Sequence, residues 1–161
     1  MHESLTFQAR AGLAIDFVSD MLQREGYTWV RAASSSMAPL IRPGDDLRLV
    51  PLAGGHLRPG AIVAFRRGGE LVVHRVVDQR SEGVVTRGDA LPDADSPVIW
   101  NDVIGGVAAI RTPSGQLVDL KRWPRPLIDR GLAALTSFSP SSRFAWIVRR
   151  ALFHLVARLA R

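Results

Sequence analysis

The chain has 161 residues, enough for one domain with at most a small extension. Its apolar fraction of 47% supports a hydrophobic core, and the absence of cysteine excludes disulfides, thiolate metal sites and a cysteine nucleophile. The formal net charge of +6 rests almost wholly on arginine, since Lys121 is the only lysine, and this balance suits an anionic partner without identifying one.

The first predicted element is an N-terminal helix over residues 1–26, with Gly26 as its stop signal. Arg10, Asp16 and Asp20 interrupt its apolar character, so the segment is neither a signal peptide nor a membrane anchor. No stretch of the chain reaches the ~18 to 20 apolar residues of a spanning helix, and we expect a cytoplasmic protein. The apolar residues at helical spacing are Leu5, Leu13, Phe17, Met21 and Leu22.

The sequence of residues 27–120 is typical of a β domain. Short runs rich in Val and Ile alternate with turns that contain Gly or Pro, and this pattern favours an antiparallel, barrel-like folded sheet over alternating strands and helices. The expected fold class is mainly β (α+β). The predicted strands are 28–33, 45–52, 61–67, 70–77, 83–88, 103–112 and 116–120.

Residues 121–161 form a predicted helical extension with two helices, 127–138 and 143–161. The last helix has one apolar stripe interrupted by arginines, which fits either packing on the sheet or peripheral contact with an anionic membrane. Nucleic-acid binding through the arginines is disfavoured, because no motif accompanies the charge. The stripe consists of Phe144, Ile147, Val148, Ala151, Leu152, Leu155 and Leu159.

Three consecutive serines, Ser34 to Ser36, lie between the first two predicted strands. A serine cluster is ordinary turn material, so one alternative is a solvated loop. The other is a hydroxyl presented for chemistry, and a serine nucleophile then requires a base.

Of the four histidines, only His74 lies within a strongly apolar predicted strand. His2 lies near the N-terminus, His56 in a glycine-bearing loop, and His154 in the last predicted helix. Alternation puts His74 on the same face as Val72 and Val76. From alternation alone, a histidine that is simply hydrogen-bonded on a sheet face is the more common explanation. The other explanation is that His74 is a general base held on a rigid strand.

Asp89, Asp93 and Asp95 lie in one loop after the strand 83–88. They can be solvated turn residues, or one carboxylate can orient an imidazole. A hard cation is disfavoured, because the spacing lacks the ligand alternation and glycine of a calcium loop. Lys121 is a poor base for a Ser-Lys mechanism, because it follows the last predicted strand beside a Trp-Pro turn.

The order of these segments resembles the signal peptidase I and LexA-like serine peptidase superfamily between Trp29 and Ala109. The histidine in the base position is similar to the archaeal and endoplasmic-reticulum branch, which uses Ser, His and Asp, whereas the bacterial signal peptidases and LexA-like repressors have lysine there. The resemblance implies a serine endopeptidase without a cofactor or metal. The matching segments are "SSSMAPLIRPGD", "RPGAIVAF", "VVHRVV", "TRGDALPDAD" and "VIGGVA".

The resemblance also implies a role for each matching residue. Ser36, just before Met37, matches the nucleophile, and His74 matches the general base. Asp95 matches the carboxylate that orients the histidine, and Asp89 matches a second carboxylate needed near the site; Asp93 is the fallback for Asp95. Ser34 matches a hydroxyl donor of the oxyanion hole, in which the backbone N–H of Ser36 is the second donor.

Three features depart from the family pattern. The N-terminus has no spanning anchor, thirty residues before the first matching segment cannot hold a DNA-binding domain, and "GDAL" stands where Gly-Asp-Asn is more usual. We therefore expect maturation of a peptide or protein precursor. The alternatives are a membrane-associated signal peptidase for secreted proteins, anchored through residues 121–161, and a catalytically idle module that only binds a peptide.

Overall fold

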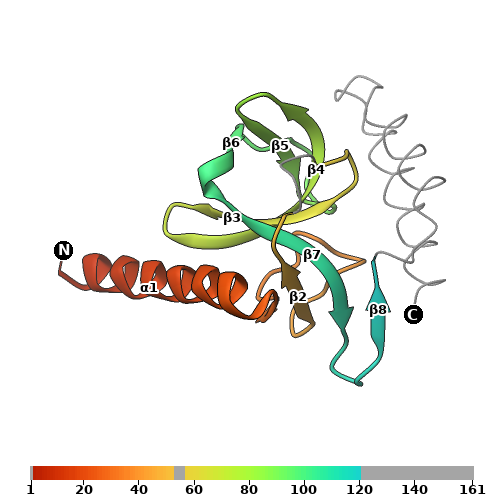
Figure 1. Cartoon of the computed structure of the whole chain (residues 1–161), viewed down its shortest axis with the longest axis horizontal. Coiled ribbons are helices and arrows are strands. Elements are labelled where there is room, and N and C mark those ends of the chain that lie inside the picture. The colour runs from red at the N-terminus through yellow and green to blue at the C-terminus, as the bar shows by residue number, and fades with distance from the viewer. Residues whose placement is uncertain (1, 53–56, 121–161) are drawn as a thin grey trace.

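The computed structural model describes residues 2–52 and 57–120, and only the backbone of residues 2–11. It consists of one N-terminal helix and one antiparallel sheet (Figure 1). The predicted mainly β fold is confirmed at this level. The predicted C-terminal helices lie outside the described residues, as do His56 and His154.

The sheet contains every strand expected from the sequence and one that was missed. The missed strand is β6, only two residues long and followed by the 3-10 turn η1, Trp100–Asp102. The strands are β1 Thr28–Arg31, β2 Asp46–Val50, β3 Ile62–Arg67, β4 Glu70–Arg80, β5 Gly83–Arg87, β6 Val98–Ile99, β7 Val103–Arg111 and β8 Leu117–Asp119.

The sheet is open, so the expected closure into a barrel is wrong for the described part of the chain. Its strand order is β1-β2-β7-β3-β4-β5-β6, with β8 paired to β7, and β1 and β6 form the two ends without pairing to each other. A barrel needs its first and last strands to be hydrogen-bonded. Here each half of the sheet surrounds its own apolar cluster, so burial does not require closure.

The two core clusters meet at β3. Ile62 and Ala64 belong to the first cluster, whereas Val63 and Phe65 belong to the second. Because successive side chains of a strand point to opposite faces, β3 is buried on both sides. This burial explains why its sequence is a continuous apolar run rather than an alternating one.

Helix α1, His2–Glu25, ends where Gly26 adopts a positive φ of 71° and its N–H bonds to the carbonyl of Leu22. The expected apolar stripe is partly wrong, because Leu13 and Phe17 are 70% and 64% exposed. Leu22 of that stripe is buried as expected, and Ile15, which was not part of it, is buried as well. Helix α1 projects to one side of the sheet, so only part of one face reaches it (Figure 1).

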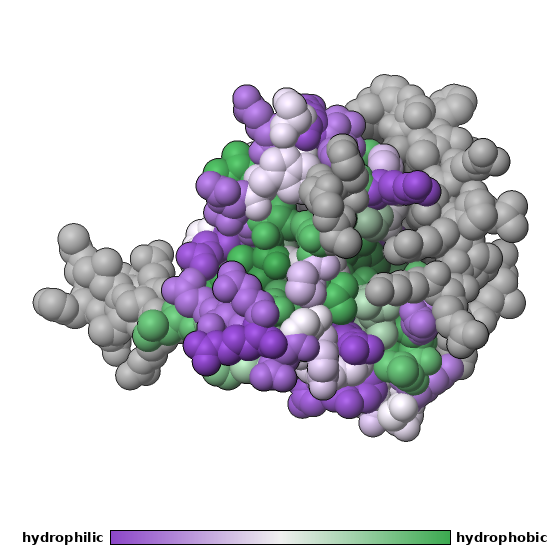
Figure 2. All heavy atoms as spheres, in the orientation of Figure 1, coloured by the Kyte–Doolittle hydropathy of each residue, from purple (hydrophilic) through white to green (hydrophobic). Residues whose placement is uncertain are grey.

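Hydrophobic residues gather in the middle of the face shown in Figure 2, with hydrophilic residues around them. The hydrophilic residues thus lie mainly toward the rim of this face, as burial of the apolar strands requires. Across residues 2–52 and 57–120, no helix combines the length and the apolar character needed to cross a bilayer.

Candidate active site

The serine triplet lies in a loop between β1 and β2 that is closed at its base. The N–H of Ala32 bonds to the carbonyl of Asp45 at 2.8 Å, and the N–H of Gly44 bonds to the carbonyl of Ala32 at 2.8 Å. Met37 is buried in the first core cluster. These contacts fix the loop, so that Ser36 is half-buried next to an anchored residue while Ser35 is exposed.

His74 is held rigidly on β4. Its register partner is Val63 of β3, and its side chain is only 6% exposed. The edge of its ring meets Phe65, with ring centroids 6.0 Å apart and an interplanar angle of 65°. A packed ring on a central strand has little freedom to change its orientation.

Asp95 is fixed by β5 and lies against the same imidazole. Its N–H bonds to the carbonyl of Thr86 at 2.7 Å, and Thr86 Oγ1 donates to Asp95 Oδ2 at 2.6 Å. The Asp95 side chain is 10% exposed. Thr86 therefore fixes both the backbone and the carboxylate of this residue.

Ser36, His74 and Asp95 form one hydrogen-bonded chain. His74 Nδ1 lies 2.7 Å from Asp95 Oδ2, and His74 Nε2 lies 3.2 Å from Ser36 Oγ. A carboxylate can only accept, so Nδ1 carries the proton and the lone pair of Nε2 is left for the Ser36 hydroxyl. This arrangement allows the imidazole to take a proton from the serine.

The charge of Asp95 is supported by its neighbours. Burial acts to raise the pKa of Asp95, but hydrogen bonds from Thr86, His74 and Arg67 together outweigh it and hold that pKa below its usual range. Arg67 Nη1 donates to Asp95 Oδ1 at 2.7 Å. The carboxylate is therefore ionised at neutral pH and can stabilise an imidazolium.

Asp89 does not contact His74. Both of its carboxylate oxygens accept hydrogen bonds from Arg75, at 2.8 Å from Nε and 2.7 Å from Nη2, and the pair is largely buried. Arg75 also donates to the carbonyl of Gly60 at 2.8 Å. Asp89 is thus a buried ion-pair partner of the residue that follows the histidine.

The residues on either side of Asp89 contact the serine loop. The N–H of Ala90 donates to the Ser36 carbonyl at 2.9 Å. A Cβ added to Gly88 would lie 2.8 Å from the same carbonyl oxygen, so only glycine fits without a shift. The segment 88–90 therefore positions the backbone of Ser36.

Ser34 lies close enough to Ser36 to act in the same site. The two Oγ atoms are 3.2 Å apart. Among the described residues, the N–H of Ser36 donates no hydrogen bond to another group. Both donors expected for an oxyanion hole are thus next to the serine oxygen.

The three aspartates of the acidic loop do not converge. Asp95 contacts His74, Asp89 contacts Arg75, and Asp93 is exposed. No group of three or more metal-ligating side chains occurs within the described ranges.

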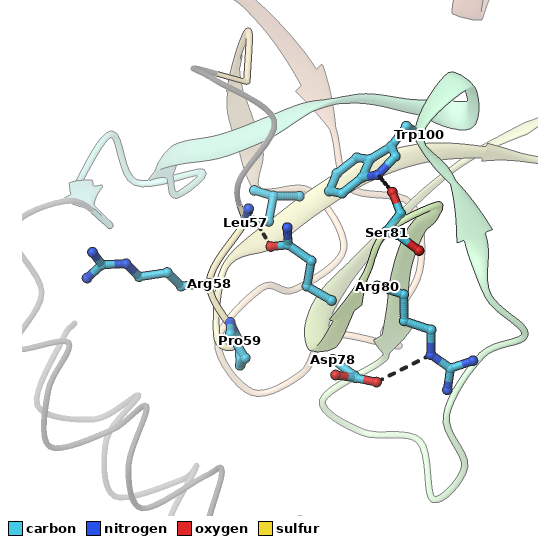
Figure 3. A pocket seen from close by; sticks show the side chains of 8 residues that line it. Leu57, Arg58, Pro59, Asp78, Arg80, Ser81 and Trp100 are labelled. Atoms are coloured by element: carbon cyan, nitrogen blue, oxygen red, sulfur yellow. Dashed lines mark hydrogen bonds and ion pairs between the residues drawn. The ribbon is translucent and has the colours of Figure 1, made fainter.

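A separate open hollow lies at the far end of β4, and none of the predicted site residues lines it (Figure 3). Trp100 Nε1 donates to the Ser81 carbonyl at 2.9 Å beside it. Asp78, which is part of its wall, is four residues beyond His74, roughly 13 Å along an extended strand. The hollow is therefore distinct from the serine-histidine pair. Its lining residues are Leu57, Arg58, Pro59, Asp78, Gln79, Arg80, Ser81 and Trp100.

Sequence reasoning missed three residues that support the site. Arg67 and Thr86 hold Asp95, and Arg75 holds Asp89. Thr86 stands out within an apolar strand and Arg75 directly follows His74, so both gave a weak signal. Arg67 gave none, because it is one of two adjacent arginines before a Gly-Gly turn.

Comparison with known proteins assigns no family: no protein-family model matches the chain, and no curated protein matches it. What the site can do is therefore judged from its own geometry.

Proposed function

We propose that this protein is a serine endopeptidase that cleaves a peptide or protein precursor, in the manner of the signal peptidase and LexA-like superfamily whose motifs its sequence resembles. One observation carries the proposal: the hydrogen-bonded chain from Ser36 Oγ through His74 to Asp95. The antiparallel sheet around this chain agrees with the expected mainly β architecture, but within the described residues it is open and not barrel-like.

In the proposed mechanism, Ser36 Oγ attacks the scissile carbonyl while His74 Nε2 takes the hydroxyl proton. The negative oxygen of the tetrahedral intermediate is stabilised by the Ser34 hydroxyl and the Ser36 N–H. The imidazolium then gives its proton to the leaving amine, and a water activated by His74 hydrolyses the acyl-enzyme. Apart from the hydrolytic water, the groups named in these steps belong to Ser34, Ser36 and His74.

The proposed substrate is an extended peptide. Strand β1 leads directly into the serine loop and pairs only with β2 among the described strands. Its other edge therefore offers backbone groups to which an extended peptide can add as a further strand. The resemblance implies small residues beside the scissile bond.

The test is cleavage of a peptide library followed by mass spectrometry. Ser36→Ala and His74→Ala should each lower turnover at least about a thousandfold, because removing one member of a cooperating unit costs about as much as removing the whole unit. Ser35→Ala is the matched control, since Ser35 is exposed beside Ser36, and it should stay within about twofold of wild type. If His74→Ala keeps wild-type turnover, the mechanism is wrong. A folded wild-type protein that binds peptides and cleaves none would be an idle module.

A further inference from the structure

Arg67 makes three contacts at the edge of the proposed site. Nη1 donates to Asp95 Oδ1 at 2.7 Å, and Nη2 donates to the carbonyl of Ser96 at 3.3 Å. The guanidinium carbon lies 4.9 Å from the centroid of the Phe65 ring. The Arg67 side chain thus donates hydrogen bonds both to the Asp95 carboxylate and to the backbone of the loop that carries Asp95.

These contacts differ from those of an ordinary surface ion pair. The Arg67 side chain is 40% exposed, but its partner Asp95 is only 10% exposed and is hydrogen-bonded to His74. The Phe65 ring beneath the guanidinium also meets the edge of the imidazole. Arg67 therefore acts on a carboxylate whose charge the histidine experiences directly.

We propose that Arg67 is a positioning residue that fixes the segment 95–96 against β3. Its guanidinium also partly neutralises the charge of Asp95 that acts on the imidazole. Arg67 thereby sets the pH range in which His74 is neutral and able to act as a base. The effect on turnover rests on the proposed peptidase function. The effect on the histidine does not.

The direction of the effect follows from the charges around the site. Without the guanidinium, the full charge of Asp95 faces the imidazole, and a charged imidazolium is favoured. Glu70 is the register partner of Arg67, and exposed Asp93 lies two positions before Asp95 in the sequence. Thr86 and Ser36 contribute neutral hydroxyls. Arg75, which is paired with Asp89, is on the opposite face of β4 from His74, and the exposed Asp78–Arg80 pair lies at the C-terminal end of that strand.

The experiment is an NMR titration of the His74 imidazole in the full chain, with Arg67→Gln, Arg67→Lys and the control Arg66→Gln. Arg66 is the neighbouring arginine and pairs with Asp16 of α1 instead. Arg67→Gln should raise the titration midpoint by about 0.5 pH unit or more, because it removes the charge. Arg67→Lys should keep the midpoint within about 0.2 pH unit of wild type, and Arg66→Gln should leave it unchanged. The acid limb of kcat/KM should move in parallel in Arg67→Gln.

A folded Arg67→Gln protein with an unchanged midpoint would overturn the inference, as would an equal change in Arg67→Lys. A loss of thermal stability alone, with no change in the midpoint, would make Arg67 a merely structural residue and would also overturn it. If the midpoint moves as expected but no variant or wild type cleaves any peptide, the coupling of Arg67 to His74 stands and the proposed peptidase function fails.

Discussion

The two ring nitrogens of His74 face oxygens of different chemistry. Nδ1 faces a carboxylate that can only accept a proton, whereas Nε2 faces a hydroxyl that can donate one. The ring is buried against Phe65, so packing fixes the orientation in which Nδ1 faces Asp95 and Nε2 faces Ser36 before any substrate binds. A histidine on an exposed sheet face would need to order its ring during the reaction, at a cost in side-chain entropy.

The lowered pKa of Asp95 predicts how the stability of the fold changes in acid. Because the pKa of this carboxylate in the folded state lies below the value of about 3.9 for an unfolded aspartate, it stabilises the native state above that pH, and this contribution is lost as the pH falls through the folded value. The free energy of unfolding should therefore fall less between pH 7 and pH 3 in Asp95→Asn than in wild type. Urea unfolding at both pH values measures the difference.

Asp93→Asn is the control for this measurement, since Asp93 lies in the same loop and is exposed. Its loss of stability between the two pH values should match that of wild type. Identical losses in wild type and Asp95→Asn would show that Asp95 does not contribute.

At the scale of elements, the site is assembled by β3 and β4 together with two loops. Strand β3 is buried on both faces and carries Phe65 under the imidazole, while β4 carries His74. The serine loop follows β1, and the loop with Asp95 follows β5. Residues far apart in the chain therefore meet because antiparallel pairing aligns the strands that carry them.

Asp89 and Asp95 of the acidic loop should respond differently to substitution, because Asp89 pairs with Arg75 whereas Asp95 contacts His74. Asp89→Asn removes one charge of a buried bidentate pair and leaves Arg75 uncompensated, so it should lower the free energy of unfolding by about 3 kcal/mol and also reduce turnover. Asp95→Asn should reduce kcat by about 10⁴ with a smaller loss of stability, because it loses control of the His74 tautomer. Thermal unfolding and kcat of both variants separate the two roles.

Asp93→Asn again provides the matched control and should change stability by less than about 0.5 kcal/mol. If Asp89→Asn and Asp95→Asn affect stability and kcat equally, the assignment of a structural role to Asp89 is wrong.

At the scale of the molecule, the predicted helix over 143–161 lies outside the described residues. From its arginine-rich amphipathic sequence we separately propose that this helix contacts an anionic membrane. Spanning is disfavoured by its sequence, because each central arginine costs ~2.5 to 3.5 kcal/mol on insertion scales. The full chain should sediment with anionic vesicles but not with neutral ones, and less so as salt rises.

Deleting residues 142–161 should remove this vesicle binding and leave cleavage of a soluble peptide largely intact. A full chain that stays in the supernatant with both kinds of vesicle would exclude the membrane contact and favour packing of this helix on the domain.

Local chemistry along the chain is enough to predict much of this protein. Short runs rich in Val and Ile between Gly or Pro turns locate every strand except β6, which is only two residues long, and Gly26 marks the end of α1. The strand and turn signals are local because backbone propensity and side-chain alternation act over a few residues. The candidate site residues were suggested by the resemblance of ordered segments to a peptidase superfamily, since local chemistry alone left ordinary explanations for the serines, His74 and the aspartates.

The remaining features depend on contacts between distant parts of the chain. The sheet stays open because each half buries its own cluster, and α1 buries Ile15 rather than Phe17 because of where the helix meets the sheet. The choice among three nearby aspartates, and the ion pair from Arg67 to the selected one, depend on where the loop after β5 returns to β3 and β4. No periodicity encodes that geometry, because it is set by strand pairing and packing across the whole domain.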